Sequence, residues 1–153
     1  MDTVRNEVYA AAEKKYEAYA VKGLKEKITL YGLGMQHIRF TKDEPALYRL
    51  LFLRQAAGEN NGLLKAMEHL QTIARASLEN IYHMTPAEAD RCFRDMWLVV
   101  HSLATLIVTG ECPYGEEEIG QILIGFSVSV CKANKEIPGF TTGTLDKTGF
   151  FKR

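Results

Sequence analysis

Two segments in the second half of the chain are apolar on every side of a predicted helix, and this limits the folds that are open to it. In residues 86–109 a broad apolar stripe includes Trp97, yet Leu98 and Leu106 lie off that stripe and are also apolar. The segment from Glu116 to just before Pro138 has the same character. A helix of this kind has to be covered on both sides.

Two such helices are difficult to cover within 153 residues. We therefore expect a homodimer in which two copies of the helix pair form a four-helix interface. The alternative is a central hairpin that is covered on both sides within a monomer. The residues that we expect at the dimer interface are Leu103, Ile107, Ile119, Leu123, Phe126 and Val130.

The rest of the chain also has helical spacing. Apolar residues recur every three or four positions in segments 2–21, 24–40, 46–53 and 63–81. Thr85-Pro86-Ala87-Glu88 has the pattern of a capping box and opens the next helix. Gly32 and Gly34 either allow close packing or a kink, or are simply tolerated. The sequence predicts an all-α bundle of about six helices over residues 1–138, with an irregular tail over 139–153.

Charge and cysteine usage argue against several classes of partner. Lys and Arg together number 19, as do Asp and Glu, whereas duplex binding needs an excess of basic residues. We expect no nucleic-acid binding by this chain alone. The three cysteines have no CxxC spacing, which argues against a disulfide framework and favours a cytoplasmic location. The sequence has neither a signal-peptide pattern nor an apolar run of about 18 residues, so we expect no membrane partner.

The sequence also lacks a recognisable catalytic or metal-binding motif. No two histidines are spaced for a shared metal on one helix. Neither a nucleophile elbow nor a phosphate-binding loop is present, and the cysteines have no sequence neighbour that would activate a thiol. We expect no catalytic residue, no metal and no cofactor. The opposing hypothesis, a helical enzyme, would need ionisable groups that converge in a cleft.

Trp97 and His101 lie one turn apart on the first of the two apolar helices. One interpretation is an aromatic wall with a polar group inside a small-molecule pocket. The other is a core tryptophan beside a buried histidine that is bonded to a carbonyl group. The same two interpretations, pocket or core, apply to Met35, Tyr48, Phe52 and Met67.

Two stretches resemble the TetR family of transcription regulators. Residues 43–52, which read DEPALYRLLF, are similar to the x-x-P-x-L-Y-x-L-x-F segment in the C-terminal domains of that family. Residues 97–104, which read WLVVHSLA, are similar to its W-x-x-x-H-G-x-A element, with Ser102 in place of the usual glycine. Together with the order of the helices, the resemblance covers about residues 2–135.

The resemblance implies an effector-binding and dimerisation domain whose last two helices build the dimer interface. The helix-turn-helix module of the family has no counterpart in this sequence. The implied effector is an apolar or amphipathic small molecule, and the implied ligand-binding residues are Met35, Tyr48, Phe52, Met67, Trp97 and His101. The alternative function is a structural interaction protein that dimerises without a ligand, including with a full-length relative.

Overall fold

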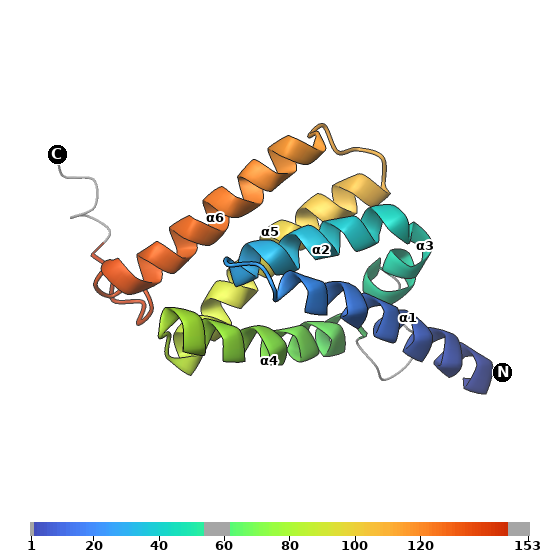
Figure 1. Ribbon diagram of the computed structural model, residues 1–153, viewed down its shortest axis with the longest axis horizontal. Coiled ribbons are helices and arrows are strands. Elements are labelled where there is room, and N and C mark those ends of the chain that lie inside the picture. The colour runs from blue at the N-terminus through green and yellow to red at the C-terminus, as the bar shows by residue number, and fades with distance from the viewer. Residues whose placement is uncertain (1, 54–61, 147–153) are drawn as a thin grey trace.

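The computed structural model describes residues 2–53 and 62–146, with side chains for 3–53 and 68–146 (Figure 1). These ranges contain six α-helices, a short π-helical segment and no strand, which confirms the predicted all-α class. None of the helices in the described ranges is long and apolar enough to cross a membrane. The elements are α1 (Asp2–Gly23), α2 (Thr29–Asp43), α3 (Pro45–Tyr48), the π-helical η1 (Arg49–Leu53), α4 (Gly62–Tyr82), α5 (Pro86–Val108) and α6 (Glu116–Glu136).

Helix α2 lies at the centre of the bundle and contacts α1, α4, α5 and α6. Helices α1 and α4 lie on one side of it and α6 lies on the other, alongside α5 (Figure 1). The first turns of α1 project beyond the bundle (Figure 1). The core is therefore built mainly between α2 and α5.

Helix α2 begins at Thr29 rather than near residue 24, because two glycines fix the crossing of α1 and α2. A Cβ atom on Gly23 would lie 2.6 Å from the Gly32 carbonyl carbon, and one on Gly32 would lie 2.1 Å from the Gly23 oxygen. Residues 24–28 form the turn that brings these backbones together. Of the alternatives for Gly32, close packing is the one that the structure shows.

Side chains satisfy backbone groups at both ends of α5. Thr85 and Glu88 form the predicted capping box at its start. At its end, the Arg49 guanidinium donates a hydrogen bond to the Val108 carbonyl at 2.6 Å, which satisfies one of the acceptors that a helix end leaves free. After α6, residues 137–146 form turns and irregular structure, and residues 147–153 of the predicted tail lie outside the described residues.

Candidate functional site

A cluster of seven aromatic rings fills the centre of the bundle. Its members come from five elements and contact one another edge-on or stacked: Tyr16, His37, Tyr48, Phe52, Phe93, Trp97 and His101. We call this set the aromatic cluster. Along α5, one-turn spacing stacks Phe93 on Trp97 with centroids 6.0 Å apart, and Trp97 on His101 with centroids 6.1 Å apart. The His37 ring meets Trp97 edge-on at 5.0 Å.

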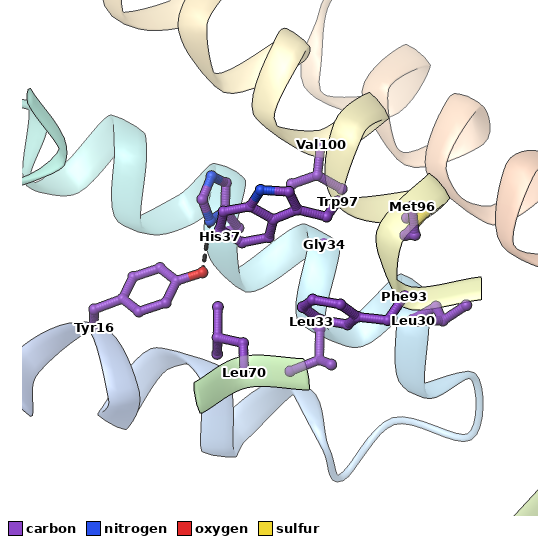
Figure 2. Close-up of a pocket in the computed structure, with 10 residues that line it drawn as sticks. All are labelled: Tyr16, Leu30, Leu33, Gly34, His37, Leu70, Phe93, Met96, Trp97 and Val100. Atoms are coloured by element: carbon purple, nitrogen blue, oxygen red, sulfur yellow. Dashed lines mark hydrogen bonds between the residues drawn. The ribbon is translucent and has the colours of Figure 1, made fainter. Parts of the chain in front are cut away.

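His37 is a neutral imidazole that lacks one hydrogen bond. Its Nδ1 pairs with the Tyr16 hydroxyl at 2.6 Å (Figure 2). Burial lowers the pKa of His37 to about 3, so the ring carries no charge at neutral pH. Its Nε2 is buried with no hydrogen-bond partner among the described residues, and it points away from Tyr16 (Figure 2). An unpaired buried polar group costs roughly 1–3 kcal/mol, so this nitrogen is open to a ligand's hydrogen-bonding group.

A second tyrosine–histidine pair lies on the far side of His37. The Tyr48 hydroxyl and His101 Nδ1 are 3.0 Å apart. Burial raises the pKa of Tyr48 to about 12 and lowers that of His101, so both groups are neutral at pH 7. The partner of His101 is thus a tyrosine hydroxyl rather than a carbonyl group. The π-helical turn of η1 brings Phe52 against this pair, at 5.0 Å from the Tyr48 ring.

A small apolar cavity adjoins the aromatic cluster (Figure 2). The space open to the centre of a water molecule is about 20 Å³, enough for roughly one water. A drug-sized ligand needs about 300–1,000 Å³, so the side chains around the cavity would have to move to admit one. No side chain in its lining is charged: Tyr16, Leu30, Leu33, Gly34, His37, Leu70, Phe93, Met96, Trp97 and Val100.

The structure brings together four of the predicted ligand-binding residues, namely Tyr48, Phe52, Trp97 and His101. Of these, only Trp97 also lines the cavity. Met35 is partly buried against the core but does not line the cavity. Met67 belongs to α4, and its side chain lies outside the described residues.

Four of the predicted dimer-interface residues are buried within the single chain: Leu103, Ile119, Leu123 and Val130. Ile107 and Phe126 are partly buried. The exposed apolar surface of the same two helices is formed instead by Leu98, Leu106, Ile124 and Val128, which we call the outer face. On the α5 side, Leu98 and Leu106 also line a shallow groove together with Val99, Ser102, Leu103, Tyr114 and Ile122.

The sequence analysis did not single out His37, although its position carried a signal. Leu30, Gly34, His37 and Thr41 recur at helical spacing, and all four are buried on α2. A histidine within such a buried stripe has to find a partner inside the protein. Tyr16, which supplies that partner, is buried on α1 together with Ala12 and Ala20.

No group of three or more potential metal ligands occurs in the part of the chain that the structure describes. In comparisons with known proteins, no family model, curated protein or solved structure matches the chain.

Proposed function

We propose that this chain is a ligand-sensing and self-associating helical module, analogous to the effector-binding half of the TetR-family regulators that its motifs resemble. The single observation that carries the proposal is the unpaired Nε2 of His37 inside an aromatic cluster that adjoins an apolar cavity. A pocket of this make-up combines an apolar lining with a few polar groups that orient the ligand.

The chemistry of the site defines the ligand class. Because His37 is neutral and the cavity lining carries no charge, a charged group would lose its hydration there without a counter-charge. The ligand is therefore apolar, with one neutral hydrogen-bonding group for Nε2. A hydroxyl group suits either tautomer of the imidazole, because it both donates and accepts. Binding would shift the module toward the conformation in which the cavity is wider.

A matched pair of small probes tests this proposal. Phenol carries a hydroxyl group where toluene carries a methyl group of similar size. Binding of each is followed through the indole N–H cross-peak of Trp97, the chain's only tryptophan. We expect phenol to bind several-fold more tightly than toluene, because a net hydrogen bond is worth about 1 kcal/mol. In the variant His37→Leu the preference should disappear.

Two negative results are possible, and each contradicts a different part of the ligand-binding proposal. If neither probe moves the indole signal at any soluble concentration, the cluster is a filled core and the sensing function is wrong. If toluene binds as well as phenol in the native chain, the site takes ligands but His37 does not orient them. Far-UV circular dichroism of His37→Leu shows whether the variant keeps its helices.

Self-association is supported by the outer face. Leu98 is 59% exposed, Ile124 40% and Val128 48%, and they lie on two neighbouring helices. Large exposed apolar patches are typical of protein-binding sites, and these side chains are the apolar groups that α5 and α6 offer for one. In the proposed dimer, outer faces from two copies pack together, and the buried residues Leu123 and Ile119 stay in the core of each copy.

One observation favours a second candidate function, an interaction module that needs no ligand. The cavity admits only about one water, so a core that stays closed is compatible with pairing through the outer face alone. The probe experiment separates the two candidates, because this second function predicts dimerisation together with no response of Trp97 to phenol.

A further inference from the structure

Two cysteines that lie far apart in the sequence meet between α5 and α6. Cys92 is fully buried on α5, and Cys131 is partly buried on α6. The two thiols lie close enough that each shifts the pKa of the other. Asn134, one turn after Cys131, donates its amide Nδ2–H to Cys92 Sγ at 2.9 Å. The sequence analysis found no activating neighbour for either thiol, because this neighbour lies on another helix.

The surroundings give the two sulfurs different properties. A hydrogen bond from Cys92, together with the nearby Lys135 ammonium, lowers the pKa of the Cys131 thiol. The same hydrogen bond and burial raise the pKa of the Cys92 thiol. Cys131 is also the more accessible of the two. Since the thiolate is the reactive form, Cys131 is suited to react first and Cys92 to react with the product.

We propose that Cys92 and Cys131 form a reversible disulfide when the protein meets hydrogen peroxide, so that α5 and α6 become covalently joined. The Cys131 thiolate attacks peroxide, an S–O bond forms as the O–O bond breaks, and hydroxide leaves to become water. The Cys92 sulfur then attacks Cys131, an S–S bond forms as the S–O bond breaks, and its proton leaves with a second water. Two electrons pass from the sulfurs to peroxide, and a reducing thiol restores the pair.

Asn134 is placed to assist the second step as a positioning residue. Its Nδ2 holds Cys92 Sγ and also donates to the Val130 carbonyl at 2.7 Å. Its Oδ1 is buried and has no hydrogen-bond partner in the described part of the chain. This oxygen can accept a hydrogen bond from the S–OH group of oxidised Cys131, which would hold the sulfenic acid beside Cys92.

The disulfide would act next to the candidate ligand site and independently of the proposed function. Met96 lines the cavity one turn after Cys92, and its sulfur accepts a hydrogen bond from Ser127, one turn before Cys131, at 3.6 Å. The bond would therefore fix the spacing of α5 and α6 beside the cavity wall. It would also stabilise the fold by closing a long loop in the unfolded chain.

The test treats the folded, full-length chain with hydrogen peroxide, blocks free thiols with iodoacetamide and maps the peptides by mass spectrometry. We expect a Cys92–Cys131 crosslink, with Cys112 alkylated. Oxidation should raise the melting temperature by roughly 5–10 °C, and dithiothreitol should reverse it. The control variant Cys112→Ser should behave like the native chain, because Cys112 lies in the loop between α5 and α6, where its sulfur donates a weak hydrogen bond to the Tyr114 carbonyl at 3.8 Å.

Three variants keep the proposal open to contradiction. In Cys92→Ala, dimedone should trap a sulfenic acid on Cys131. In Cys131→Ser it should trap no sulfenic acid on Cys92. In Asn134→Leu the crosslink should form several-fold more slowly, while trapping on Cys131 persists. A crosslink that appears only in urea, crosslinks only through Cys112, or oxidation of Cys131 to the sulfinic acid without any crosslink would each overturn the proposal.

Discussion

The core side and the outer face of the α5–α6 pair break the usual rule of burial in opposite directions. On the core side the fold encloses polar groups, including His37 and Ser127. On the outer face it exposes Leu98, Ile124 and Val128. In most proteins buried positions are apolar, and a buried polar group needs a full set of hydrogen bonds.

This contrast shows where the single chain lacks interactions that a ligand or a partner could supply. On the core side the shortfall is in hydrogen bonds, at Nε2 of His37 beside the cavity and at Oδ1 of Asn134 between α5 and α6. On the outer face it is a set of apolar side chains that stay exposed in the part of the chain that the structure describes. Departures from local rules are expected where a protein meets a ligand or a partner. A small molecule would complete the first region and a second copy of the chain the second.

The largest expected effect separates two neighbouring residues of α6. Leu123 is fully buried, whereas Ile124 is 40% exposed. We expect Leu123→Ala to lower the free energy of unfolding by about 2–5 kcal/mol, because it leaves a cavity in the core. Ile124→Ala should cost about 0.5 kcal/mol or less in dilute protein. Urea denaturation measures both, and equal losses would show that the two sides of α6 do not differ.

The outer face can also be disrupted without touching the core. Leu98→Asp places a charge in the proposed interface, and we expect it to raise the dimer dissociation constant about 30-fold or more, since central apolar contacts are worth about 2 kcal/mol or more. Sedimentation equilibrium measures the constant. The matched control is Ile81→Asp on α4, where an equally exposed residue lies outside the outer face. A native chain that stays monomeric at all concentrations would rule out pairing by this face.

The buried imidazole predicts how stability depends on pH. Burial lowers the pKa of His37 to about 3, whereas an unfolded histidine titrates near about 6.5. The unfolded chain therefore binds more protons between these values. The contribution of His37 to the free energy of unfolding is complete above pH about 6.5 and is lost as the pH falls toward about 3.

Between pH 7 and pH 5, His37 alone lowers the free energy of unfolding by about 2 kcal/mol. His101 adds to it in the same direction, because burial lowers its pKa as well. Urea denaturation at the two pH values, on the native chain and on His37→Leu, isolates the His37 share. An unchanged pH dependence in the variant would mean that His37 titrates normally in the folded protein.

Local signals in the sequence predicted the fold class and most helix ends. The apolar repeat of α4 and the capping box of Thr85 and Glu88 are properties of short segments, and the structure has both. The start of α2 was predicted wrongly, because it depends on the contact between Gly23 and Gly32 across two helices. A contact between residues on two different helices cannot be read from the spacing of apolar residues along the chain.

The candidate site could be predicted only in part, for a related reason. Trp97 and His101 were found because one-turn spacing places them together whatever the packing. Which side of α5 and α6 faces the core could not be read, since helices that are apolar all round have no polar side to orient them. For the same reason the sequence could not bring Cys92 to Cys131, whose meeting depends on how the two helices are aligned.

The smallest expected effect gives the sharpest test of the outer face. A methyl group added at Gly125 would meet nothing within 4 Å, and one at Gly120 would first meet the Tyr31 hydroxyl at 3.8 Å. Within one chain, Gly125→Ala and Gly120→Ala should therefore both stabilise α6 by about 0.5–1 kcal/mol through helix propensity. Gly125 lies next to Ile124 in the proposed interface, where a second helix can approach closely only if that position has no side chain. If two outer faces pack together there, Gly125→Ala should weaken the dimer while Gly120→Ala leaves it unchanged. Equal behaviour of the two variants in sedimentation equilibrium would mean that no partner helix approaches α6 at this point.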